Sequence, residues 1–217
     1  MNYQTLKDRQ REERHQHSEA LGLRVHRALS WLNRAEQCSD EDPDGQFIFL
    51  WIAFNAAYAN DTGDIRIAEG KRFNEFLNRL VELDDKGQLA ALTWQQYPKA
   101  IRVLLDNAYV FQPFWDHLNG LDSGLYWEEQ FSKAKVAANK ALASKNTGKV
   151  LAIVFNRLYT LRNQLIHGGA TWNSRVNRDQ VRDGSRIMAD VVPVVIEIMM
   201  DHAGEHWGEA CFPVVEL

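Results

Sequence analysis

The chain has 217 residues, of which 45% are hydrophobic and 25% are charged, and this ordinary globular balance excludes a disordered protein. The length fits one domain with one substantial core. The two cysteines, Cys38 and Cys211, provide neither a disulfide framework nor a clustered metal site, so we expect reduced thiols in a cytoplasmic protein. The start of the chain has no apolar signal-peptide core, and no apolar segment is long enough for a membrane helix.

The first predicted elements are helices. Residues 1–17 form a polar N-terminal segment, in which Leu6–His17 lacks an apolar face and is expected to be a solvated or frayed helix. Ser18–Gln37 has apolar residues at three- and four-residue spacing, which predicts an amphipathic helix. After a loop rich in acids, Phe47–Tyr58 is apolar on nearly every face, which is typical of a helix at the centre of a bundle.

The middle of the chain is also predicted to be helical. Asn60–Gly63 breaks the chain, and Arg72–Lys86 then forms an amphipathic helix. Leu89–Leu118 is predicted to be two helices that separate near Gln112-Pro113, because proline removes a backbone donor and crowds the preceding turn. Trp127–Ser144 has only a thin apolar stripe, so we expect it on the surface.

Two long helices complete the prediction. The first is Gly148–His167, with Thr147 as its expected N-cap and Gly168-Gly169 as its end. The second runs from about Asn177 to His202 and is followed by an acidic tail over residues 203–217. The whole chain, 1–217, is therefore predicted to be a single all-α domain, a helical bundle with an elaborated helical middle segment. Its most buried helices should include Phe47–Tyr58, Gly148–His167 and Ile187–Met200.

The net charge of −4 conceals a strong asymmetry. From Lys145 to Arg186 there are eight basic residues and two acidic ones, a local charge of +6. From Ile187 to Leu217 there are six acidic residues and no Lys or Arg. A local positive field of this kind is typical of a site for a phosphate-bearing ligand, although a solvated charged face explains the charge equally well.

The candidate chemistry lies in the last turns of the Gly148–His167 helix. Asn163 and His167 are separated by four residues and share one face, and Arg162 is adjacent to Asn163. The negative end of the helix dipole favours the imidazolium form of His167 by ~0.3–1 kcal/mol. Together these side chains could cleave a phosphodiester: the imidazole moves a proton, Arg162 neutralises charge on the phosphorus oxygens, and Asn163 orients one or both.

A structural explanation of the same residues is also open. Arginine and histidine are common in last helical turns because they suit the exposed carbonyl groups. The general pattern of Arg, four to six residues and then His also occurs at Arg9–His15 and Arg11–His17, in a segment without an apolar stripe. What distinguishes the third occurrence is its context: a core helix, an asparagine directly after Arg162, and two glycines directly after His167.

Residues 161–169, Leu-Arg-Asn-Gln-Leu-Ile-His-Gly-Gly, resemble the Arg-x(4–6)-His signature of the HEPN family (higher eukaryotes and prokaryotes nucleotide-binding domains), in its bacterial ribonuclease form with four intervening residues. Trp51–Tyr58 is similar to the apolar, Asn-containing early helix of several bacterial branches. By position, Arg162 and His167 match the catalytic pair, and Asn163 matches the polar residue that follows the arginine. The long middle, Arg66–Ser144, departs from a minimal bundle of this family.

The resemblance implies a homodimer that pairs the two motif helices, and metal-independent endoribonuclease activity in a defence or toxin–antitoxin setting. An antitoxin or other regulatory protein is then a possible partner. Some members of the family are inactive binding modules.

Two functions are therefore open. The first is an endoribonuclease that cleaves single-stranded RNA without metal or other cofactor, because the 2′-hydroxyl attacks the phosphorus and leaves a 2′,3′-cyclic phosphate. In this hypothesis four basic side chains bind RNA: Lys149, Arg157, Arg175 and Arg178. The alternative is a non-catalytic helical module that binds a nucleotide, nucleic acid or a partner protein, which suits the overall acidity and the acidic tail.

Two other patterns are given a structural interpretation. His202-Ala-Gly-Glu-His206 matches the inverted zinc-protease pattern, but Gly204 weakens the helix and no structured third ligand follows, so no metal site is predicted. Asn55 is expected to be a buried amide that is hydrogen-bonded to a neighbouring helix, because an unpaired buried amide is costly.

Overall fold

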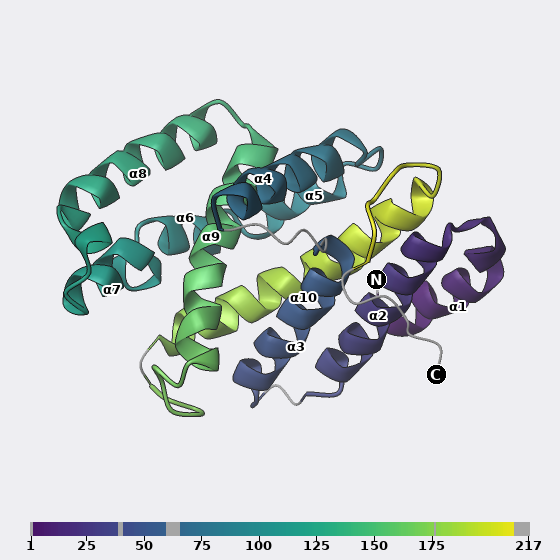
Figure 1. The fold of residues 1–217 in the computed structure, drawn as a ribbon, viewed down its shortest axis with the longest axis horizontal. Helices are drawn as coiled ribbons and strands as arrows, with labels where there is room; N and C mark the ends of the chain where they lie inside the picture. The colour runs from purple at the N-terminus through teal and green to yellow at the C-terminus, as the bar shows by residue number, and fades with distance from the viewer. Residues whose placement is uncertain (1, 39–40, 60–65, 176, 211–217) are drawn as a thin grey trace.

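The computed structural model describes residues 2–38, 41–59, 66–175 and 177–210 (Figure 1). Cys211, the break at Asn60–Gly63 and the end of the acidic tail lie outside these residues. The described residues form ten α-helices joined by short helical turns and loops, and they contain no strand. The prediction of an all-α helical bundle is confirmed.

One side of the molecule is a bundle around the last helix, α10 (Arg178–Asp201). The helices α2 (Glu19–Glu36) and α3 (Pro43–Tyr58) pack against each other and against α10 (Figure 1). Ser18 begins α2 by accepting a hydrogen bond from the Leu21 amide at 3.2 Å, and every apolar residue of the predicted stripe is buried. Nearly all of Ile187–Met200 is buried, because α10 meets other helices on most of its faces, as predicted.

The N-terminal helix α1 (Tyr3–Glu13) differs from the prediction of a solvated or frayed segment. It packs against α2 and α10, with Leu6 buried in the common core. Arg9 also pairs with Asp201 of α10 at 2.7 Å. One apolar anchor and one ion pair are enough to dock this helix, and neither produces the repeating stripe that sequence periodicity detects.

The other side of the molecule is the elaborated middle of the chain. Its elements are α4 (Arg66–Glu82), α5 (Gln88–Ala91), a π-helical turn (Leu92–Gln96), α6 (Pro98–Leu105), a 3-10 turn (Ala108–Val110), α7 (Gln112–Leu118) and α8 (Trp127–Ala143). The predicted separation at Gln112-Pro113 is present, but an additional break at Pro98 was missed. Both prolines lie in the first turn of a new helix, where the missing N–H has no intrahelical partner to lose. As predicted, α8 lies on the surface and buries only Ala138 and Ala141.

The two sides are joined by α9 (Thr147–Ile166), which contacts α4, α6 and α8 as well as α3 and α10 (Figure 1). Its N-cap is Asn146, whose side chain accepts a hydrogen bond from the Lys149 amide at 2.9 Å. The prediction of Thr147 as the cap was wrong, because the Thr147 hydroxyl accepts a hydrogen bond from Trp94 Nε1 at 2.9 Å instead. None of the helices in the described residues is both long and apolar enough for a membrane span.

The close crossing of α10 with α3 and α9 depends on Gly184. A Cβ atom at this position would lie 2.9 Å from Leu158 Cδ2 and 3.3 Å from Phe47 Cε2. We expect Gly184→Val to lower the free energy of unfolding by ~1–3 kcal/mol through overpacking, measured by urea denaturation. The control is Gly22→Val in α2, where an added Cβ has no neighbour within 4 Å. Equal effects of the two substitutions would contradict the steric argument.

Candidate functional site

The predicted motif closes α9 with a well-defined cap. Gly168 has a left-handed backbone conformation, with φ of +70°. Its amide donates to the Leu165 carbonyl at 3.3 Å, and the Gly169 amide donates to the Gln164 carbonyl at 2.8 Å. This pair of bonds is a Schellman motif. The residue after the helix has a left-handed backbone conformation in this motif, and glycine adopts that conformation without strain. The predicted role of Gly168-Gly169 is confirmed.

Arg162 lies half-buried near this cap, and its side chain is held by neutral neighbours. Nη1 donates to Asn163 Oδ1 at 2.9 Å, and the guanidinium lies 5.6 Å from the centre of the Tyr159 ring. The Nε atom is buried without a hydrogen-bond partner. Among the described residues no carboxylate pairs with Arg162, so its positive charge is positioned but not neutralised.

The Tyr159 ring connects Arg162 to the early apolar helix α3. Tyr159 packs on Trp51, with the ring centres 6.0 Å apart. Trp51 is buried, so the surface under Arg162 is rigid and aromatic. This support was not predicted, although an aromatic residue three positions before Arg162 lies on a neighbouring part of the helix surface.

His167 follows the last helical residue and is exposed. Its backbone amide donates to the Asn163 carbonyl at 3.0 Å, which fixes its position relative to Arg162 and Asn163. His167 thus follows Asn163 on the last turn of α9, and Asn163 is hydrogen-bonded to Arg162.

Gln164, between Arg162 and His167, anchors the turn to two other segments. Its Nε2 donates to the Tyr109 carbonyl at 2.6 Å, and its Oε1 accepts from Asn177 Nδ2 at 2.9 Å. Asn177 is the N-cap of α10. The sequence analysis assigned no role to Gln164, because neither partner lies within one helical turn of it in the sequence.

The loop between α9 and α10 is attached to the start of α3 by two acidic residues. Asp44 is nearly buried and accepts from the Asn173 amide at 3.0 Å and from Arg178 at 2.8 Å. Asp42, the N-cap of α3, accepts from Trp172 Nε1 at 3.2 Å. These bonds place the loop beside the motif and leave the Trp172 side chain 75% exposed.

The four basic residues expected to bind RNA lie in different environments. Lys149 and Arg175 are exposed. Arg178 is engaged in the ion pair with Asp44, so its charge is neutralised in the fold. Arg157 is only 2% exposed, and this corrects its expected role, because a buried guanidinium cannot contact the backbone of an RNA strand on the surface. Arg157 is one of the buried residues of α9 and lies among packed helices instead.

The remaining residues singled out in the sequence are Asn55 and the His202–His206 pattern. Asn55 is half-buried, and its side chain forms no hydrogen bond with a described residue, so the predicted bond to a neighbouring helix is wrong. His202 Nε2 lies 2.8 Å from the Leu83 carbonyl, and Glu205 pairs with Arg79. Within the described ranges no group of three or more His, Cys, Asp or Glu side chains is arranged to hold a metal ion.

The chain was also compared with known proteins. No protein-family model, no curated protein and no solved structure matches it.

Proposed function

We propose that the protein is a metal-independent endoribonuclease of the HEPN type that cleaves single-stranded RNA, with Arg162, Asn163 and His167 as its catalytic residues. The observation that carries this proposal is the guanidinium of Arg162, held by Asn163 and Tyr159 without any carboxylate partner, on the same turn as an exposed histidine. An arginine that served only the fold would be expected to pair with an acid or with helix carbonyl groups. A positioned but uncompensated charge suits an anionic substrate.

The reaction follows from the groups on this turn. The substrate 2′-oxygen attacks the adjacent phosphorus, the bond from phosphorus to the 5′-oxygen breaks, and the products are a 2′,3′-cyclic phosphate and a 5′-hydroxyl. One imidazole accepts the 2′-hydroxyl proton, and another donates a proton to the departing 5′-oxygen. Arg162 stabilises the negative charge on the non-bridging oxygens, while its bond to Asn163 fixes the direction of the guanidinium.

Exposed aromatic surface near the motif suits a single-stranded substrate. Trp172 is anchored by Asp42 but keeps most of its indole in solvent, and Tyr159 is 45% exposed beside Arg162. Unpaired bases stack on such rings, at ~1–3 kcal/mol per base, whereas duplex bases are not available to them. Arg175, in the same loop, adds an exposed positive charge for the phosphate backbone.

The direct test is to incubate the purified protein with 5′-labelled single-stranded RNA in excess EDTA. We expect fragments that end in a 2′,3′-cyclic phosphate, because the nucleophile belongs to the substrate. The matching DNA oligonucleotide, which lacks the 2′-hydroxyl, should remain intact. If all RNAs remain intact while the protein retains them in a binding assay, the non-catalytic binding module replaces the nuclease.

The proposal includes a two-fold dimer, because one protomer carries one Arg162–His167 pair and the reaction needs both a proton acceptor and a proton donor. Ile166 is 46% exposed at the end of α9, next to the half-exposed Tyr159, and this apolar surface is available for pairing two motif helices. A regulatory protein such as an antitoxin would act by covering the same surface.

We expect the protein at tens of micromolar to have twice the mass of the chain by light scattering. Ile166→Asp should yield monomers and a large loss of RNA cleavage, because it places two like charges at the two-fold contact. The matched control is Val136→Asp on α8, an apolar residue that is 67% exposed away from the motif. A wild-type protein that is monomeric and still cleaves RNA would contradict the dimer.

A further inference from the structure

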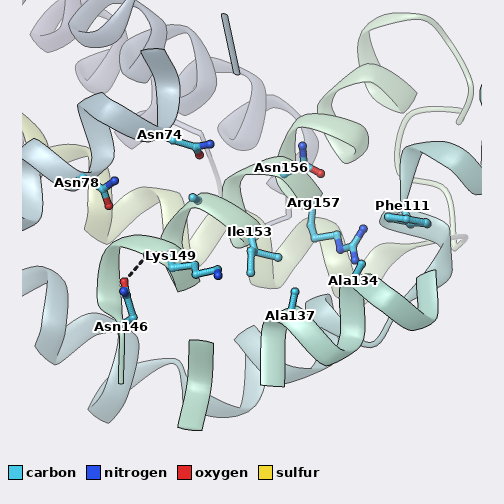
Figure 2. A pocket seen from close by; sticks show the side chains of 11 residues that line it. Asn74, Asn78, Phe111, Ala134, Ala137, Asn146, Lys149, Ile153, Asn156 and Arg157 are labelled. Carbon is cyan, nitrogen blue, oxygen red and sulfur yellow. Dashed lines mark hydrogen bonds between the residues drawn. The ribbon is translucent and has the colours of Figure 1, made fainter. Parts of the chain in front are cut away.

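A cavity of about 540 Å³ lies between α4, α8 and α9 (Figure 2). Its size falls in the range of pockets that hold small organic molecules. The lining includes two cations and four amides but no carboxylate: Lys149, Arg157, Asn74, Asn78, Asn146 and Asn156. A cavity with this lining has a positive potential and many hydrogen-bonding groups.

Arg157 is the unusual member of this lining. Its side chain is 2% exposed, and the guanidinium carbon lies 4.4 Å from the centre of the Phe111 ring and 5.6 Å from that of Phe131. Nε is buried without a hydrogen-bond partner, and no described carboxylate pairs with the side chain. Burial lowers the pKa of Arg157 to about 10, so the fold holds a cation that it does not compensate. Buried charges are ordinarily paired, and the missing partner is therefore an anion from outside the chain.

The rest of the cavity lining indicates the shape and polarity of that ligand. Phe111 and Ile153 provide apolar surface beside the guanidinium (Figure 2). Lys149 lies eight residues before Arg157 on α9, about 12 Å along the helix axis, and its side chain extends over the cavity in Figure 2. The amides of Asn74 and Asn78 lie on the opposing helix, α4. An elongated molecule is thus met by a cation at each end, by the Phe111 ring at the Arg157 end, by Ile153 between the two cations and by amides along one side.

We propose that this cavity binds a small organic anion, whose phosphate or carboxylate group pairs with Arg157 beside the two phenylalanine rings and whose other end reaches Lys149 and the asparagine amides. Neutralisation of a desolvated guanidinium is the source of affinity, and the apolar wall selects an organic molecule over a free inorganic ion. The site is separate from the motif, because the cavity lining on α9 ends at Arg157 and includes none of Arg162, Asn163 and His167. It does not depend on ribonuclease activity.

The test measures the melting temperature of the wild-type protein with three probes at constant ionic strength: inorganic phosphate, AMP and adipate, an elongated dicarboxylate. We expect AMP or adipate to raise the Tm by roughly 5 °C or more at saturation, with little change in inorganic phosphate. A response to AMP alone assigns the acidic group to a phosphomonoester, and a response to adipate alone assigns it to a carboxylate. If none of the three probes changes the Tm, the proposal is wrong.

Two substitutions test whether the ligand binds in this cavity. Arg157→Met should abolish the ligand-induced shift without lowering the Tm of the ligand-free protein, because it removes an unpaired buried charge and conserves volume. Lys149→Met, at an exposed position that cannot disturb the core, should weaken binding at least tenfold by calorimetry, whereas Lys99→Met on α6 should leave it unchanged. If Arg157→Met lowers the Tm and the organic probes still bind, Arg157 serves packing alone and the proposal is overturned.

Discussion

Replacing Arg162 by alanine should lower the rate of RNA cleavage by ~10²–10³, the usual cost of removing a donor that stabilises an oxyanion. The guanidinium is half-buried and stacked on Tyr159, so no other side chain of this turn replaces its charge. The measurement is the single-turnover rate at saturating RNA, which separates the chemical step from binding.

Arg162→Ala must remain folded for this result to be meaningful. Arg162 lies off the buried stripe of α9 and makes one side-chain hydrogen bond, to Asn163, so we expect a Tm close to that of the wild type. Arg11→Ala, which removes an exposed arginine from a similar Arg–His pattern near the N-terminus, should retain full activity. A folded Arg162→Ala protein with wild-type rates would exclude Arg162 from catalysis.

His167→Ala should lower the rate by ~10²–10⁴ through loss of proton transfer. The change should also alter the shape of the pH–rate profile, because the imidazole is the proposed proton-transfer group. His167 is exposed and its amide, not its ring, completes the end of α9, so the substitution should not disturb the cap.

The control for His167→Ala is His15→Ala, an exposed histidine beside the N-terminal helix. It should leave both the rate and the pH profile unchanged. If His167→Ala lowers the rate but leaves the shape of the pH profile intact, the imidazole positions the substrate and another group transfers the proton.

Much of the fold could be predicted because its strongest helices carry their own local signals. Ser18 caps α2, the Gly168-Gly169 pair ends α9, and dense apolar content marks α3 and α10. These signals lie within one or two helical turns of the residues they affect. The docking of α1 by Leu6 and Arg9 could not be predicted, because its partners lie in helices distant in the sequence.

The same limit applies to the candidate site. Asn163 and His167 could be predicted to share a face because they are four positions apart on a helix, and Arg162 is adjacent to Asn163 in the sequence. Gln164, Tyr159 and Asp44, which position the motif and its loop, act through contacts with segments more than ten residues away. Arg157 was predicted to lie at the surface because basic residues are mostly exposed. Its contact with the Phe111 ring could not be inferred from the sequence.

The double anchor of Gln164 has a consequence for the thermodynamics of substrate binding. Helix ends ordinarily fray, and a catalytic turn that frays must be ordered each time a substrate arrives. Here the Tyr109 carbonyl and the Asn177 side-chain amide hold Gln164, which lies between Arg162 and His167. The Gly168-Gly169 cap holds the end of the same turn. The conformational entropy of this turn is therefore lost once, during folding, and in the proposed reaction more of the binding energy of the RNA strand would act on the transition state.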